Sequence, residues 1–468
     1  MDSSRSPTSR SARGDGPARL AIRLILLAAL AAAPLAFGGV QPGFYQPFLA
    51  VLFLTGAASW ARARWARANG EPVPTVPGVK LLLALHALVL IQLVPLPEPF
   101  LARISPGSVA MLGFREYGSW HPVSVDPKAT WWGLAFLAGM SLLFATSFRE
   151  FRNERWARRL ALLVVGVAVV ATLVGFVQRA SPDPGLIYGH WKAADGHVVF
   201  GPYVNRNHYA GYLVMAIPLL AAIVGGSARR FVGLARRIGV RAVGQPEATA
   251  VLQGCAALVL LVGGVLFAAS RAGIVASTLA LGLVALGLGR RMIPALVLVG
   301  SIGLLGALTV DLSWFAGIFS GRRDLTYTRV ALWRDQVRLV PDFPMLGTGF
   351  NALGRPYRRI QTYERVNAFD QAHNDYLQLY LETGPVGALI GIGLLVLLAR
   401  CALRGARHSE LGRGLLAALL ASAITALVDF NWQIPGNAAT FVALAGVALG
   451  RVADTDGPAD LDPLAGHT

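Results

Sequence analysis

The chain has 468 residues, of which 54% are hydrophobic and 14% are charged. Its mean hydropathy of +0.54 excludes an ordinary water-soluble globular protein, so the sequence predicts a protein that folds in lipid. The formal net charge of +17 could indicate a nucleic-acid partner. The positions of the arginines favour a membrane-orientation signal instead, and no nucleic-acid partner is expected.

Twelve stretches are long and apolar enough to form membrane spans. A spanning helix needs roughly 20 mostly apolar residues, and backbone polar groups in hydrocarbon must pair within the segment. We therefore predict an all-α, polytopic membrane protein of about twelve transmembrane helices, with a large outer loop that contains an amphipathic helix. The predicted spans lie near residues 19–38, 45–61, 78–95, 129–147, 157–178, 205–224, 250–269, 271–289, 292–310, 377–399, 411–428 and 436–450.

The basic residues predict the orientation of these spans. If the N-terminus lies inside, every cytoplasmic connection carries arginine, as the positive-inside rule requires. The chain then divides into a disordered cytoplasmic tail over 1–18, a membrane domain over 19–452 and a second disordered cytoplasmic tail over 453–468. Residues 20–36 would also fit the apolar region of a cleaved signal peptide, which is the alternative for the first span.

The longest outward connection, residues 311–376, is rich in arginine. Long loops cross membranes largely regardless of charge, so orientation does not explain these arginines and we expect an anionic ligand there. An amphipathic helix is predicted over residues 325–340, lying along the outer surface. The apolar residues near helical spacing are Leu325, Val330, Trp333, Val337 and Val340.

A first polar cluster, Asn205, Arg206, Asn207 and His208, begins the sixth predicted span at its outer end. The free N–H groups and partial positive charge of a helix N-terminus suit a phosphate or diphosphate, and Arg206 adds a full charge. The alternative is structural, with Asn205 as an N-cap and Arg206 extended to the interface.

A second cluster, Ser270 and Arg271, lies in the short outer turn before the eighth predicted span. Ser270 is expected to cap this helix. An arginine at this depth costs free energy unless an anion pairs with it, so Arg271 is a candidate site residue. The alternative is an interfacial anchor.

The third cluster, AHNDYLQLYLE, opens the tenth predicted span with His373, Asn374 and Asp375. Asp375 and Glu382 are seven residues apart and share a helix face with Gln378, which predicts a polar face toward a cavity. A histidine oriented by a carboxylate is a suitable general base for a hydroxyl, and an ordinary loop histidine is the alternative.

A zinc site is a weaker interpretation of the histidines. Such a site would use His190, His197, His208 and His373, but no metal-ligand spacing such as HExxH connects them. Glycine-rich phosphate loops and the GxSxG motif are also missing from the sequence. We therefore expect neither a metal nor a cofactor.

Four segments taken together resemble the O-antigen ligase and polymerase superfamily. They are VNRNHYAGYL, SRAGIVA, TRVALWRD followed by GTGFNALG, and AHNDYLQLYLETGPVGAL, in this order over roughly residues 200–400. The resemblance implies a multi-pass protein of the bacterial inner membrane, with cytoplasmic termini and a periplasmic active face. It implies glycan transfer from an undecaprenyl diphosphate carrier to an acceptor hydroxyl on a glycan, a lipid A-core or a protein.

The resemblance also implies roles for individual residues. His373 and Arg271 match functional residues of the family, as do Arg206 and Arg329. We expect a metal-independent, inverting reaction in which Arg271 and Arg206 hold the diphosphate and His373 takes the proton of the acceptor. Asp375 or Glu382 would orient the histidine or bind sugar, and Arg329 would contact glycan or diphosphate.

Two other functions remain open. A transporter or flippase for a lipid-linked anionic glycan would also need arginines at its outer mouth. It predicts charged residues along the middle of several spans, whereas here they collect at the outer ends. The second alternative is a non-catalytic assembly partner. Ligase, polymerase and protein O-oligosaccharyltransferase share these motifs and are not separated by them.

Overall fold

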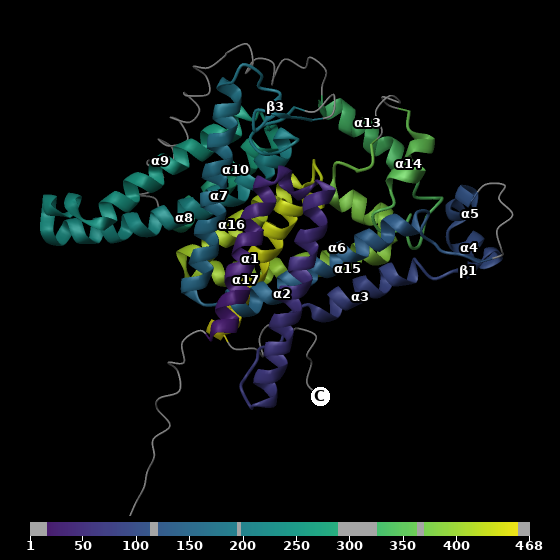
Figure 1. The fold of residues 1–468 in the computed structure, drawn as a ribbon, viewed down its shortest axis with the longest axis horizontal. Coiled ribbons are helices and arrows are strands. Elements are labelled where there is room, and N and C mark those ends of the chain that lie inside the picture. The colour runs from purple at the N-terminus through teal and green to yellow at the C-terminus, as the bar shows by residue number, and fades with distance from the viewer. Residues whose placement is uncertain (1–15, 113–119, 194–197, 289–324, 363–368, 457–468) are drawn as a thin grey trace, which may run out of the picture.

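The computed structural model describes residues 16–112, 120–193, 198–288, 325–362 and 369–456, and these residues are mostly helical (Figure 1). Two pairs of very short antiparallel strands are the only sheets in this described part. The helices are α1 (Pro17–Leu35), α2 (Pro42–Ala68), α3 (Val79–Ile91), α4 (Glu98–Ile104), α5 (Pro106–Leu112), α6 (Pro127–Glu150), α7 (Glu154–Ala180), α8 (Arg206–Ile238), α9 (Pro246–Phe267), α10 (Arg271–Leu288), α13 (Leu325–Val337), α14 (Gly354–Ile360), α15 (Asp375–His408), α16 (Glu410–Thr425) and α17 (Pro435–Asp456), with 3₁₀ turns η1 (Phe37–Gly39), η2 (Gly239–Gly244) and η4 (Asn431–Gln433). The strands are β1 (Leu96–Pro97), β2 (Trp120–His121), β3 (Leu186–Ile187) and β4 (Trp191–Lys192).

Eight described helices are long and apolar enough to cross a membrane, namely α1, α2, α6, α7, α8, α9, α15 and α17. This confirms an all-α, multi-pass membrane fold. Three more predicted spans coincide with α3, α10 and α16, which are shorter helices. The predicted span near 292–310 lies outside the described residues, as do most of both predicted tails, so the total of twelve stays a prediction.

The core of the bundle forms around α8. Alanine and leucine side chains between Tyr209 and Ala222 are buried, and α8 packs against α7, α9, α10 and α16. Glycines allow close approach to this helix. A Cβ on Gly264 of α9, for example, would lie 2.4 Å from the hydroxyl of Tyr209. The first turn of α8, which carries the first polar cluster, is therefore held on a rigid and well-packed element.

The first helix is packed into the bundle and tied to the end of α6. Leu26 and Arg23 are fully buried. Arg23 Nε donates to the Glu150 carbonyl at 2.8 Å, and the Glu150 carboxylate accepts from Arg19 at 2.9 Å and from Arg62 at 2.7 Å. These contacts join α1 to the ends of α2 and α6.

The described parts of residues 92–126 and 325–374 form a layer at one end of the bundle, here called the cap. Figure 1 shows α4, α5, α13 and α14 together on this side. Gly107 N donates to Asp342 O at 2.8 Å and Val125 N donates to Thr348 O at 3.0 Å. Leu332, Leu339 and Phe343 belong to a small apolar core within the cap. Two outward connections distant in the sequence thus form one unit.

The predicted amphipathic helix is present as α13, but its buried face differs from the predicted stripe. Val330 and Val337 are exposed, whereas Leu332, Asp335 and Gln336 are buried. The helix packs on the rest of the cap, and this contact selects the buried face. The chain turns after Val337, so Val340 lies outside the helix.

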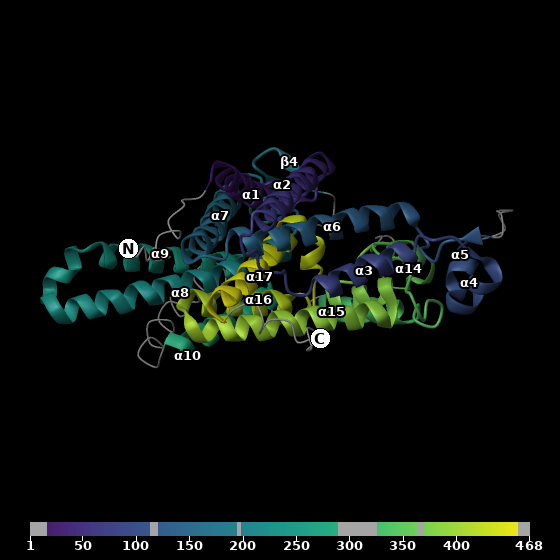
Figure 2. The same ribbon diagram turned by 90° about the horizontal axis from the view of Figure 1, so that it is seen from below.

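Helix α15 has a break that positions its first two turns. Gly384 has a φ of +67°, which favours glycine, and it precedes Pro385. A Cβ on Gly384 would lie 2.1 Å from the Met345 carbonyl oxygen, so the cap loop touches the helix at the break. Gln92 Nε2 bonds both sides of this contact, to Leu346 O at 2.6 Å and Glu382 O at 2.7 Å. Figure 2 shows α15 running alongside α3 and α6.

Candidate functional site

Three of the predicted site residues meet at Asp429. This buried side chain lies in the loop between α16 and η4. Arg329 Nη2 donates to Asp429 Oδ2 at 3.1 Å. His373 Nδ1 and His208 Nε2 lie 3.4 Å and 3.6 Å from Asp429 Oδ1. The site therefore joins the cap, the start of α8 and the loop after α16.

The surroundings of Asp429 favour its ionised form. Burial alone would raise the pKa of Asp429, but the polar contacts with His208 and His373 and the positive charge of Arg329 hold this pKa well below its usual range. The carboxylate is thus a fixed negative charge at neutral pH, able to orient an imidazole and to stabilise it when it takes up a proton.

The two histidines differ in access. The His208 side chain is 4% exposed and the His373 side chain is 22% exposed. Both rings meet the ring of Phe430 edge to face, with centroids 4.6 Å apart in each case. Because His373 points Nδ1 at the carboxylate, its Nε2 is the nitrogen left for a substrate. His373 is therefore the candidate base, and His208 stays within the protein.

The backbone at His373 is constrained on both sides. Its φ of +51° lies in the left-handed region, which costs free energy for a residue other than glycine. Trp333 Nε1 donates to Ala372 O at 2.8 Å, and Ala372 N donates to Gln378 Oε1 at 3.0 Å. Asn374 Oδ1 accepts from the backbone amides of Tyr376 and Leu377 and so acts as the N-cap of α15. These bonds hold the histidine at the bundle surface.

A second set of hydrogen bonds fixes His208 relative to the Asp429 loop. Asn437 Nδ2 donates to His208 O at 2.8 Å and to Asn431 Oδ1 at 3.2 Å. Tyr203 OH donates to Asn437 Oδ1 at 2.9 Å. The predicted N-cap of α8 at Asn205 is confirmed, since Asn207 N donates to Asn205 Oδ1 at 2.8 Å. The Asn207 side chain is half-buried in the same turn.

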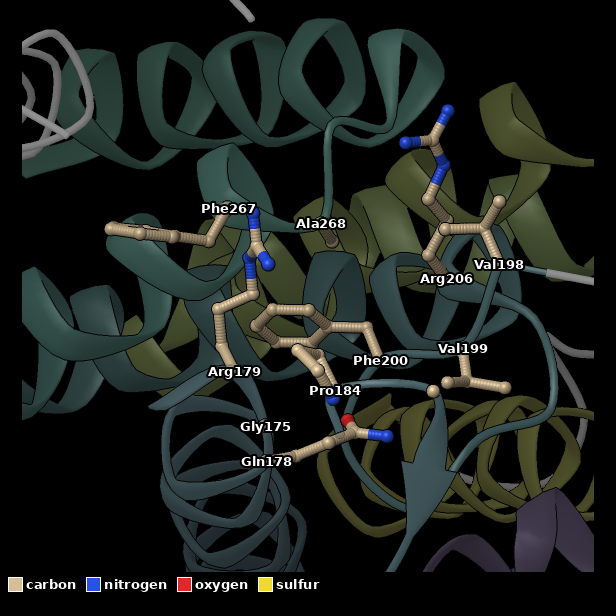
Figure 3. Close-up of a pocket in the computed structure, with 11 residues that line it drawn as sticks. Gly175, Gln178, Arg179, Pro184, Val198, Val199, Phe200, Arg206, Phe267 and Ala268 are labelled. Carbon is tan, nitrogen blue, oxygen red and sulfur yellow. The ribbon is translucent and has the colours of Figure 1, made fainter. Parts of the chain in front are cut away.

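Arg206 lines a pocket of about 340 Å³ between α7, the residues before α8 and the end of α9. Arg179 and Gln178 also line it, and Figure 3 shows the arginine side chains on opposite sides of the pocket, extending in the same direction. Arg271 is exposed at the start of α10, near enough for its charge to act on Arg206. Ser270 caps α10 as predicted, accepting from Gly273 N at 3.3 Å. Three arginines from different elements therefore lie near one another, and Arg206 precedes His208 of the Asp429 cluster by two residues.

Asp375 and Glu382 lie on one buried face of α15, as the spacing predicts. Gln378 Nε2 donates to Glu382 Oε1 at 3.1 Å, and Asn351 N donates to Glu382 Oε2 at 2.8 Å. Trp432 N donates to Asp375 Oδ2 at 3.0 Å. The carboxylate that contacts His373 is Asp429, so these two acids have other partners.

Asp429 itself is missing from the sequence prediction. It follows a predicted span directly, in the apolar run ITALVDFNW, with no basic residue beside it. An acid at the outer end of a span without a local counter-ion is a usable indication of a distant cationic partner. Phe430 N donates to Asp429 Oδ1 at 2.9 Å, but the arginine and the two histidines lie at least 56 residues away in sequence, so the spacing does not identify them.

The zinc alternative gains no support from the geometry. Within the described ranges, no group of three or more His, Cys, Asp and Glu side chains is arranged to hold a metal ion. His197 lies outside these ranges. His208 and His373 approach the same carboxylate oxygen instead.

A comparison with curated proteins finds no match to the chain. Residues 256–392 match the protein family described as O-antigen ligase. This segment holds Arg271, Arg329, His373, Asp375 and Glu382 and covers less than a third of the chain. The match confirms the resemblance to the O-antigen ligase and polymerase superfamily and supports a membrane enzyme that processes glycans.

Proposed function

We propose that this protein transfers a glycan from an undecaprenyl diphosphate carrier to an acceptor hydroxyl at the periplasmic face of a bacterial inner membrane. Both termini lie in the cytoplasm in this scheme, and the acceptor is a glycan, a lipid A-core or a protein. One observation carries the proposal. His373 is accessible, and its Nδ1 faces a buried carboxylate shared with Arg329 and His208.

The proposed step is a single displacement at the anomeric carbon. His373 Nε2 takes the proton of the acceptor hydroxyl while the acceptor oxygen forms a bond to that carbon. The bond from carbon to the diphosphate oxygen breaks, and the diphosphate leaves with the electron pair. Attack opposite the leaving group inverts the configuration. Asp429 stabilises the imidazolium that forms.

Arginines supply the charge stabilisation that the leaving diphosphate needs. Arg206 lies two residues before His208, Arg271 is near enough for its charge to act on Arg206, and Arg179 lines the same pocket as Arg206. Guanidinium groups bind phosphate oxygens in a bidentate manner and hold them as charge builds up in the transition state. The step therefore requires no metal ion. Arg329 already binds Asp429, so its first role is to hold the carboxylate that orients His373.

The test is glycan transfer by purified protein in liposomes. A purified undecaprenyl diphosphate-linked glycan is the donor, and release of free undecaprenyl diphosphate is measured together with acceptor modification. His373→Ala and Arg271→Ala are expected to lose transfer while keeping the wild-type elution profile and melting temperature. His190→Ala and Arg358→Ala are matched controls, since both residues are exposed and outside the site.

Two results would contradict the proposal. If a chelator abolished transfer and a divalent cation restored it, the step would depend on a metal ion and the metal-independent step would be wrong. Movement of intact donor across the bilayer, with no diphosphate released, would favour the transporter.

A further inference from the structure

Two adjoining hollows form an apolar groove along α15. One has a volume of about 320 Å³ and the other about 200 Å³. They share Leu85 of α3, Met140 of α6 and Leu394 of α15, and α17 closes the second hollow. On α15 the lining runs from Asp375 to Leu398, a helical length of roughly 30 Å, comparable to the hydrocarbon thickness of a bilayer. We call this feature the α15 groove.

Within the described ranges, the α15 groove carries acidic and amide side chains at one end only, and Ser141 lies in the lining of the second hollow. Asp375 and Glu382 line this end, together with Gln433. Asp375 is 5% exposed, and among the described residues its Oδ1 has no hydrogen-bond partner, although Oδ2 accepts from Trp432 N. A buried carboxylate oxygen left without a donor costs free energy. A hydroxyl group placed at this end would supply the missing donor.

The charges at the two cavities indicate different ligands. The pocket beside α8 has Arg179 and Arg206 in its lining. In the described part of the chain, no Lys or Arg lines the α15 groove, and its polar end carries two acids. A diphosphate head would find no cation in this lining, whereas the hydroxyls of a sugar would donate to the oxygens of the two acids.

We propose that the α15 groove binds the hydrocarbon chain of a lipid-linked acceptor whose head is uncharged and hydroxylated, with Asp375 Oδ1 accepting a hydrogen bond from a hydroxyl of that head. This inference rests on the proposed glycan transfer and specifies its acceptor. Asp375 follows His373 by two residues, so the backbone between them spans at most about 7 Å. A sugar bound at Asp375 therefore lies close to the base. Donor and acceptor then approach the site from opposite sides.

The first experiment uses the transfer assay with an alkyl glycoside as acceptor in liposomes. Ala388 lines the α15 groove, while its neighbour Leu389 is 68% exposed, so Ala388→Trp fills the groove and Leu389→Trp is the matched control. Both variants are assayed at the same concentration of alkyl glycoside in the membrane, so partitioning of the acceptor into the lipid affects them equally. Ala388→Trp is expected to raise the KM for the alkyl glycoside roughly tenfold, which corresponds to about 1.4 kcal/mol. The KM for the donor and all constants of Leu389→Trp are expected to stay unchanged.

Asp375→Asn tests the polar end. An asparagine keeps the size but replaces one carboxylate oxygen by an NH₂ donor. The KM for the alkyl glycoside is expected to rise while the KM for the donor stays. A rise in the KM for the donor in Ala388→Trp would assign the groove to the carrier lipid and overturn the inference. An unchanged KM for the glycoside would overturn it as well.

A binding experiment separates this inference from the transfer reaction itself. A photoreactive alkyl glycoside and an alkyl phosphate with the same chain are crosslinked to the protein in liposomes, and the labelled peptides are mapped. Preferential labelling of α3, α6 and α15 by the glycoside, lost in Ala388→Trp, supports the groove even if transfer fails. Equal labelling by the phosphate would show ordinary lipid contact and refute the assignment.

Discussion

The Asp429→Asn substitution tests the candidate site most directly. It keeps the size of the side chain and removes the charge that faces Arg329, His208 and His373 at 3.1, 3.6 and 3.4 Å. The amide NH₂ group must then face at least one of these partners, and a donor facing Nδ1–H of His373 would favour the wrong tautomer. Arg329 would also lose its ion pair.

The expected loss of transfer rate is large. Removing the orienting carboxylate of a tightly aligned triad lowers kcat by about 10⁴. The His373 contact is longer than a good hydrogen bond, and the bond from Trp333 to Ala372 still holds the backbone. We therefore expect a fall in kcat of about 10²- to 10³-fold, or roughly 3–4 kcal/mol. The unpaired Arg329 adds a loss of stability of about 1–3 kcal/mol.

The assay is the initial rate of undecaprenyl diphosphate release under saturating donor and acceptor. Asp370→Asn is the matched control, because Asp370 forms an exposed pair with Arg358 and such pairs contribute little. An Asp429→Asn protein that transfers glycan at the wild-type rate, with a normal melting temperature, would refute the role given to this carboxylate.

Three further predictions address stability and positioning. Contacts in the folded protein depress the pKa of Asp429, so they contribute to the free energy of unfolding. This contribution is complete above about pH 5 and is lost as the pH falls below about 4. The difference in melting temperature between wild type and Asp429→Asn should shrink in that window, and a constant difference down to pH 3 would contradict it. Tyr203→Phe removes the hydroxyl that donates to Asn437, so we expect a severalfold fall in kcat and a loss of about 1 kcal/mol in the free energy of unfolding. A kcat equal to that of the wild type would rule out a positioning role for Tyr203. Glu150→Gln breaks a buried ionic cluster at the far end of α6, so thermal unfolding should show a loss of about 3–5 kcal/mol, while kcat of the folded protein stays unchanged.

Local features were predictable from the sequence because they depend on nearby residues. Eleven predicted spans coincide with helices, since the length and hydropathy of a segment decide whether it can cross lipid. The caps at Asn205 and Ser270 follow from the short reach of their side chains. The shared face of Asp375 and Glu382 follows from helical periodicity.

The assembly of the site depends on contacts between distant segments. The meeting of His208 and His373 at one carboxylate requires α8, α15 and the loop after α16 to lie together. The sequence around Asp429 contains no basic residue that could serve as a local counter-ion. The buried face of α13 likewise depends on packing within the cap, which outweighs the apolar stripe counted from sequence.

The break at Gly384 divides α15 into two parts, and among the described residues only the first part is bonded to the cap. The turns before it are bonded to the cap through Gln92 and the loop near Met345, and they carry His373 at their start. Asp429 comes instead from the bundle, on the loop after α16. The contact between base and carboxylate thus lies where the cap meets the bundle, beside the ion pair of Arg329 with Asp429. Because Trp432 N and Ala426 O also bond Asp375, the start of α15 is fixed to the bundle as well as to the cap, so the distance between base and carboxylate is set from both sides.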